Sequence, residues 1–191
     1  MFFTCHHVGR ISVLPALRAV AVAVMVAGVA AMVLAIIAVA GCGAWLVRAS
    51  GLLGRTDRRG VIAAITLSAE AIAWREVFWR DHSLQRRAVL TIAPGSGARE
   101  KNWPEDHFLD IVRWWSEHTG GAVVLLVGPV EAERGGIDRL QAKCLVASNL
   151  RLAQVATVLA RSALYLGNDS GISHLAAAVG VRYAAIVAEI E

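Results

Sequence analysis

Two glycine-containing segments of the chain carry residue types that can hold a phosphate group. The first, PGSGAREKNWP at 94–104, follows an apolar run. Its glycines let a ligand approach the backbone, Ser96 offers a hydroxyl, and Lys101 supplies a compact positive charge. The segment lacks the GxxxxGK[ST] pattern of a P-loop and the third glycine of a dinucleotide fingerprint. A plain turn before a helix therefore explains its glycines equally well.

The second segment is GNDSGISH at 167–174. Either Asp169 or Ser170 would cap the helix that follows, and the free N–H groups at the helix start form an anion site together with the helix dipole. Asp169 is itself negative, so we expect it to orient donor groups rather than to contact phosphate. An ordinary capped helix is the alternative explanation. His174 suits a structural hydrogen bond as well as a ligand contact.

The elements that must position these segments alternate between short apolar runs and amphipathic stretches. Strands are predicted at 88–93, 122–127, 144–147, 163–167 and 183–187, with helices at about 105–117 and 131–142, around 152–159, and after Ser170. Near-continuous apolar strands that alternate with helices indicate a parallel sheet covered on both faces. The predicted fold class is α/β and Rossmann-like. Ligands bind beyond the carboxyl ends of such strands, so we expect both segments at one edge of the sheet.

Two of the predicted helices have a clear apolar face. In each helix, apolar residues recur at the spacing of three and four residues that places side chains on one side of a helix. These faces consist of Phe108, Ile111, Val112 and Trp115 in the first helix, and of Leu152, Val155, Ala156 and Leu159 in the second. Gly120 and Gly121 are expected to end the first helix.

Residues 19–47 form an uncharged apolar stretch of 29 residues. This length exceeds the roughly 20 residues that a helix needs to cross a bilayer. Four arginines follow at 48, 55, 58 and 59, and this bias would leave the C-terminal body in the cytoplasm. The stretch is also rich in alanine and contains three glycines, which fits buried strands and helices equally well. We therefore divide the chain into an apolar region at 1–67 and an α/β domain at 68–191.

Charge and cysteine content exclude several classes of protein. The net charge of +4 arises in residues 1–60, which carry six arginines and one acid, whereas the remaining residues contain 13 basic and 14 acidic side chains. No basic stripe interleaved with aromatic residues occurs in the body, which argues against nucleic-acid binding. The three cysteines are far apart and form no CxxC pair, so neither a zinc site nor a disulfide framework is indicated. A reducing cytoplasm fits this usage.

In this order, the two segments resemble motifs of glycosyltransferase family 9, which includes the ADP-heptose–lipopolysaccharide heptosyltransferases. The resemblance covers residues 69–187 and is carried by PGSGAREKNWPEDHF, LLVGPVEAE and LYLGNDSGISHLAAAVGV. Members of the family are two-domain GT-B enzymes, and their C-terminal domain binds the nucleotide sugar. The resemblance implies an enzyme that transfers a sugar, typically heptose, from a nucleotide-diphosphate donor such as ADP-heptose to a lipopolysaccharide core or similar glycan. No metal and no further cofactor are expected.

The resemblance also assigns roles to individual residues. Ser96 and Lys101 would contact the diphosphate of the donor. Glu131 is the preferred residue to meet the ribose hydroxyls, with Glu133 as the alternative. The remaining donor-binding residues implied are Gly97, Asp169, Ser170, Gly171 and His174. The expected location is the cytoplasm, at the cytoplasmic face of the inner membrane, with contact to that membrane.

Outside this region the chain departs from the family pattern. VLPALRAV at 13–20 and GRTDRRG at 54–60 resemble two N-terminal segments of the family, and this alignment places Arg10 where the family has its presumed catalytic Asp. The family's Phe-Gly-Pro-Thr-Asp-Pro continuation is replaced by AEIE. We therefore expect the transferase to be incomplete in this chain, with a truncated N-terminal region. The alternatives are a non-catalytic nucleotide-sugar-binding fragment, or a structural domain anchored in a membrane by its apolar run.

Overall fold

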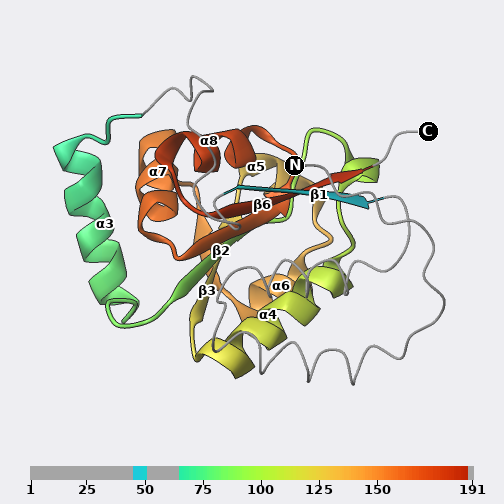
Figure 1. Cartoon of the computed structure of the whole chain (residues 1–191), viewed down its shortest axis with the longest axis horizontal. Coiled ribbons are helices and arrows are strands. Elements are labelled where there is room, and N and C mark those ends of the chain that lie inside the picture. Colours follow the sequence, from blue (N-terminus) through green and yellow to red (C-terminus); the bar gives the residue numbers. More distant parts are fainter. Residues whose placement is uncertain (1–44, 51–64, 189–191) are drawn as a thin grey trace.

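Six strands form one sheet in the order β1-β6-β5-β2-β3-β4. The structure is a computed structural model that describes residues 45–50 and 65–188 (Figure 1). The strands are β1 Trp45–Ser50, β2 Val89–Ala93, β3 Ala122–Val127, β4 Leu145–Ser148, β5 Leu164–Asn168 and β6 Tyr183–Ala188. The five strands predicted from the sequence correspond to β2 to β6, and these five pair in parallel as predicted.

The order of the parallel strands reverses between β2 and β5. From β2 the chain proceeds outward to β3 and β4, then returns to the other side of β2 and proceeds outward through β5 and β6. Ala93 at the end of β2 lies opposite Gly167 in β5. Both glycine-containing segments therefore begin at the same edge of the sheet, on either side of the point where the strand order reverses. The prediction that they share an edge is confirmed.

Strand β1 is antiparallel to its neighbour β6, with Trp45 opposite Ala188 and Ser50 opposite Tyr183. This antiparallel pairing differs from the all-parallel sheet predicted from the sequence. By pairing with β6, β1 satisfies backbone N–H and C=O groups of β6 that would otherwise lack partners at the sheet edge. Many parallel sheets have such an antiparallel edge strand. β1 also joins the predicted region 1–67 to the α/β domain.

The apolar stretch at 19–47 reaches into β1 with its last three residues, 45–47. Those residues form a strand rather than the end of a membrane-spanning helix. The rest of the stretch, and with it the predicted span, lies outside the described residues. Among the helices that the structure does describe, none combines the length and the apolar character needed to cross a membrane.

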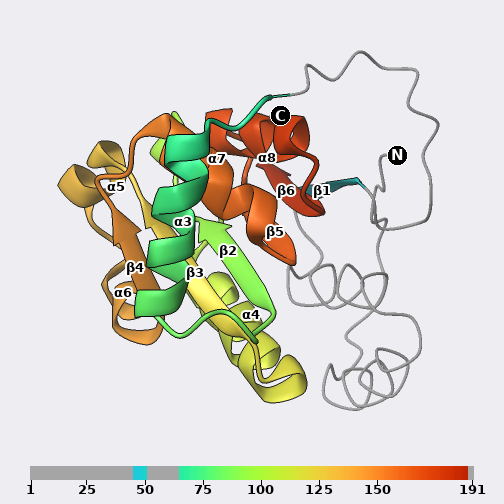
Figure 2. The ribbon, with the colours of Figure 1, turned by 90° about the vertical axis from the view of Figure 1, so that its left-hand side faces the viewer.

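Helices cover both faces of the sheet (Figures 1 and 2). Helices α4 Glu105–Thr119 and α6 Asp138–Lys143 lie on one face, and α7 Leu152–Arg161 and α8 Gly171–Val179 lie on the other. Helix α3 Ala69–Asp81, which the sequence analysis did not anticipate, packs against α7. Alternate strand residues enter the two cores: Leu90 and Ile92 pack with α4, whereas Val89 and Ala93 pack with α7 and α8.

Helix α4 confirms the predicted apolar face and the predicted stop. Phe108 and Ile111 have no exposed surface, and Val112 and Trp115 are also buried. The helix ends at Gly120, which has a φ of 61°. This left-handed conformation suits glycine because it has no Cβ.

The single helix predicted at about 131–142 is wrong, since two short helices occupy this segment. Helix α5 comprises Pro129–Arg134, and α6 begins at Asp138. Gly135 and Gly136 between them have φ values of 63° and 79°. Two consecutive residues of positive φ end a right-handed helix, and this break allows α5 to remain at the edge of the sheet while α6 packs on α4.

We expect Gly167→Ala to destabilise the fold. A Cβ at this position would lie 2.2 Å from the Tyr165 hydroxyl and 2.7 Å from the carbonyl oxygen of Ala93. Overpacking of this kind typically costs about 1–3 kcal/mol. Urea unfolding should show this loss, whereas Gly97→Ala should change stability by less than about 1 kcal/mol, because its Cβ would meet nothing within 4 Å. Equal stability of the two variants would contradict the packing described for β5.

Candidate functional site

The side chain of Asn168 holds the first glycine-containing segment against β5. Asn168 is the last residue of β5 and is fully buried. Its Nδ2 donates to the carbonyl oxygen of Pro94 at 2.5 Å, and its Oδ1 accepts from the backbone N–H of Trp103 at 2.9 Å. One amide group thus satisfies backbone groups near both ends of segment 94–104. It fixes the shape of the segment.

Ser96 forms hydrogen bonds within segment 94–104. Its side-chain oxygen lies 2.8 Å from the carbonyl oxygen of Ala98 and 2.7 Å from Oδ1 of Asn102. A hydroxyl has one proton to donate, so it serves one of these acceptors at a time. Ser96 is buried, and its hydroxyl stabilises the loop as it stands.

The turn between β5 and α8 is fixed by a second buried network. The Ser173 hydroxyl donates to the carbonyl oxygen of Asn168 at 2.6 Å and lies 3.0 Å from the Tyr165 hydroxyl. Because Ser173 has already used its proton, Tyr165 is the donor in their contact. Burial raises the pKa of Tyr165 to about 12, which keeps this donor protonated near neutral pH. These hydrogen bonds fix the backbone of residues 168–173 relative to β5.

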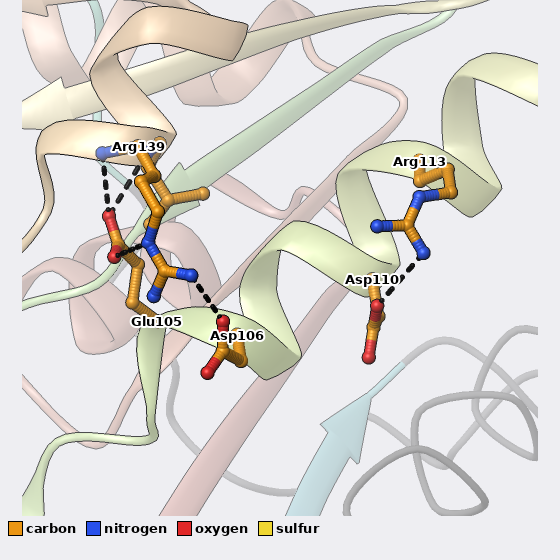
Figure 3. A network of polar contacts seen from close by, with 6 residues as sticks. Glu105, Asp106, Asp110, Arg113 and Arg139 are labelled. Carbon is orange, nitrogen blue, oxygen red and sulfur yellow. Dashed lines mark hydrogen bonds and ion pairs between the residues drawn. The ribbon is translucent and has the colours of Figure 1, made fainter.

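Glu105 anchors the far end of the first segment (Figure 3). As the first residue of α4, it accepts hydrogen bonds from the backbone N–H groups of Arg139 and Leu140 at 2.9 and 3.1 Å. It also pairs with the Arg139 side chain at 2.8 Å, which contacts Asp106 as well. The first N–H groups of a helix lack partners within the helix, so Glu105 caps α6 from outside. Helices α4 and α6 are thereby joined next to segment 94–104.

A pocket of about 700 Å³ lies at this edge of the sheet. Its walls come from the segments that follow β2, β3, β4 and β5, as expected for a crevice where the strand order reverses. Its polar and charged lining residues are Ser96, Glu131, Arg134, Asn149 and Ser170, and Gly95 and Gly97 of the glycine-rich segment also line it.

Most of the remaining lining is apolar. It includes Leu126, Val130, Leu150, Leu152, Val155 and Ile172. Leu152 differs from the rest of the predicted α7 face, because it is 67% exposed whereas Val155, Ala156 and Leu159 are buried. Leu152 is the first residue of α7 and lines the pocket.

Four of the predicted site residues line the pocket: Ser96, Gly97, Glu131 and Ser170. Lys101 is exposed and lines neither this pocket nor a smaller one of about 200 Å³ that shares Gly95, Glu131 and Arg134 with it. The other three predicted residues, Asp169, Gly171 and His174, are exposed on the β5–α8 turn beside Ser170.

Ser170 occupies the position that caps α8, but its hydroxyl makes no capping hydrogen bond. The prediction of side-chain capping by Asp169 or Ser170 is therefore wrong. Ser170 Oγ is buried and has no hydrogen-bond partner among the described residues. The turn is held by Ser173 instead, which leaves the start of α8 uncapped at the pocket wall. His174 Nε2 lies 3.9 Å from an Asp169 carboxylate oxygen, and both side chains are largely exposed.

Glu131 has a fixed carboxylate. Its Oε2 accepts a hydrogen bond from the backbone N–H of Gly128 at 2.9 Å at the start of α5. Its Oε1 lies 1.6 Å from the place that a Cβ on Gly95 would occupy. Gly95 is therefore required for Glu131 to reach the pocket wall. Glu133, its predicted alternative, is exposed and does not line the pocket.

Two residues of the candidate site were not predicted from the sequence. Asn168 lies within the second motif, but its role requires knowledge of which loop faces β5. Arg134 lines both pockets, and it follows Glu131 by three residues on a helix, a spacing that places the two side chains on one face. That spacing could have identified it. Among the described residues no group of three or more His, Cys, Asp or Glu side chains is placed to hold a metal ion. Arg10 lies outside the described residues.

The fold and the pocket define a doubly wound α/β domain with a ligand crevice where its strand order reverses. Residues 64–188 match the family described as glycosyltransferase family 9 (heptosyltransferase). The chain belongs to this family. A comparison with curated protein sequences gave no match.

Two solved structures share the fold. A glycosyltransferase of family 9 from Veillonella parvula superimposes with a TM-score of 0.58 at 26% sequence identity, over 68% of this chain and 38% of that one. The ADP-heptose lipopolysaccharide heptosyltransferase II of E. coli superimposes with a TM-score of 0.52 at 22% identity, over 63% of this chain and 38% of that one. The chain thus spans less than half the length of either protein.

We expect Asn168→Asp to destabilise the site and the fold. The substitution keeps an acceptor for Trp103 but places an oxygen against the Pro94 carbonyl, which then loses its buried donor. Leaving such groups unpaired should cost about 2–4 kcal/mol in urea unfolding.

Asn149→Asp is the matched control. Asn149 is exposed and has a φ of 56°, a conformation that both asparagine and aspartate tolerate. Its stability should change by less than about 0.5 kcal/mol. A similar loss in both variants would show that Asn168 does not have the bridging role described.

Proposed function

We propose that the described domain binds the donor substrate of a heptosyltransferase-type glycosyltransferase, a nucleotide-diphosphate sugar such as ADP-heptose. The observation that carries the proposal is that a single pocket is lined both by groups suited to phosphate and by apolar side chains. The glycine-rich segment and the uncapped start of α8 contribute backbone groups to its wall, and β3, the β4–α7 turn and α7 contribute apolar residues. This lining suits a ligand that carries both a diphosphate and a nucleobase.

Each chemical group of the donor has suitable partners among the residues that line the pocket. The N–H groups at a helix start favour an anion, and α8 provides such a start beside Gly95, Ser96 and Gly97. Leu150 and Val155 offer an apolar surface for a base. Glu131 also lines the pocket, and its carboxylate can accept hydrogen bonds from ribose hydroxyls. This assignment agrees with the role that the family resemblance implies.

We propose that such binding serves sugar transfer to a lipopolysaccharide core or similar glycan at the cytoplasmic face of the inner membrane. Backbone N–H groups and cations around the diphosphate would stabilise the charge that develops on this leaving group as the glycosidic bond breaks. The acceptor must also be positioned and deprotonated, a role for which the family resemblance expects an Asp where this chain has Arg10. This difference favours a second candidate, a protein that binds the nucleotide sugar without transferring the sugar.

Both candidates predict that the 191-residue chain binds ADP, and that Gly171→Val weakens this binding. A Cβ on Gly171 would meet nothing within 4 Å, so the fold has room for it, but a bulky side chain there would crowd the backbone that a diphosphate must approach. We expect at least about tenfold weaker binding, or ~1.4 kcal/mol, in calorimetry. Urea unfolding without ligand checks that the variant is folded. Absence of ADP binding by the folded unmodified chain would refute the proposed donor site.

Lys101→Ala tests the lysine that the family resemblance assigns to the diphosphate. Lys101 is exposed at the end of the short 3₁₀ helix η1 Arg99–Lys101, in the same segment as Ser96. A charge-assisted contact to phosphate is worth about 1.5–3 kcal/mol, so we expect binding of ADP to weaken by about tenfold or more. Unchanged affinity would remove Lys101 from the donor site without affecting the pocket assignment.

A further inference from the structure

Arg134 is the cation that the structure places in the wall of the large pocket. Of the described residues that line this pocket, Glu131 and Arg134 carry charge. Both belong to α5 and lie three residues apart, so their side chains share one face of the helix. Arg134 also lines the smaller pocket on the α4 side, and it therefore lies where the two cavities meet.

Backbone carbonyl groups hold the guanidinium against the glycine-rich segment. Its Nη1 lies 3.3 Å from the carbonyl oxygen of Ser96, and its Nη2 lies 3.4 Å from that of Gly97. Both distances are at the long end for N–H···O hydrogen bonds, and a guanidinium has five N–H donors. Arg134 is exposed and forms no ion pair with another described residue. Some N–H groups of the Arg134 guanidinium therefore remain available to a ligand that lies beside segment 94–104.

The start of α8 adds further unused donors to this pocket. Within the described part of the chain, the N–H groups of Gly171 and Ile172 have no hydrogen-bond partner, as is usual for the first turn of a helix. Ser170 and Ile172 line the pocket together with Gly95 to Gly97. The pocket wall therefore includes both the start of α8, with its backbone donors, and the guanidinium of α5.

A cation in this wall would offset the charge of a bound nucleotide. A nucleoside diphosphate is polyanionic, and Glu131 adds a further negative charge to the same wall. We propose that Arg134 contacts the diphosphate of the bound nucleotide, and that it makes the pocket selective for phosphorylated nucleotides over the free nucleoside. This assignment rests on the proposed function. A planar guanidinium can bind two phosphate oxygens at once, which a lysine cannot do with the same geometry.

The test compares the affinities of ADP and adenosine for the full chain and its variants by NMR titration. Arg134→Gln should bind ADP about 10- to 150-fold more weakly than the unmodified chain, with adenosine affinity unchanged. Arg134→Lys should recover part of the ADP affinity, because the charge remains while the forked geometry is lost. Arg151→Gln is the matched control, since Arg151 is exposed beside the pocket without lining it, and its ADP affinity should change by less than about threefold.

Each outcome separates this assignment from the proposed function. If the unmodified chain binds ADP and Arg134→Gln binds it equally well, Arg134 does not contact the diphosphate, and the donor site stands. If Arg134→Gln loses ADP and adenosine affinity by the same factor, the side chain acts only on the shape of segment 94–104, and the assignment fails. If the folded unmodified chain does not bind ADP, the proposed function and this assignment fail together.

Discussion

The side-chain amide of Asn168 joins the two loops on which the pocket depends. It is fully buried at the end of β5, where it bonds the Pro94 carbonyl and the Trp103 N–H of a segment that follows a different strand. A buried backbone group without a partner is costly, so this amide determines how segment 94–104 runs over the sheet edge. The positions of Gly95, Ser96 and Gly97 relative to the start of α8 follow from that constraint.

The glycines around this amide have three different physical roles. Gly167 allows β5 to pass the Tyr165 hydroxyl and the Ala93 carbonyl, and Gly95 makes room for the Glu131 carboxylate. Gly171 is different, because a Cβ there would meet open space. Its small size is thus not required by the fold itself, which agrees with a role in leaving the helix start accessible to a ligand. Packing thus requires glycine at positions 95 and 167, whereas at 171 only the proposed ligand would require it.

The break between α5 and α6 connects the fold to the proposed chemistry. Gly135 and Gly136 end α5 after six residues, so Glu131 and Arg134 stay at the pocket while Glu105 caps α6 and ties it to α4. The pocket wall in turn presents an acid suited to ribose hydroxyls next to a cation suited to phosphate.

The sequence by itself determined the alternation of strands and helices, the parallel pairing of β2 to β6, the buried face of α4 and the family, because apolar periodicity and motif spacing are local properties of the chain. It also indicated Ser96, Gly97, Glu131 and Ser170, which line the pocket. Tertiary structure alone decided the antiparallel pairing of β1, the exposure of Leu152, the uncapped start of α8 and the bridging by Asn168. Each of these depends on which distant segment lies alongside, and contacts between residues as far apart as Pro94 and Asn168 leave no periodic signal in the sequence.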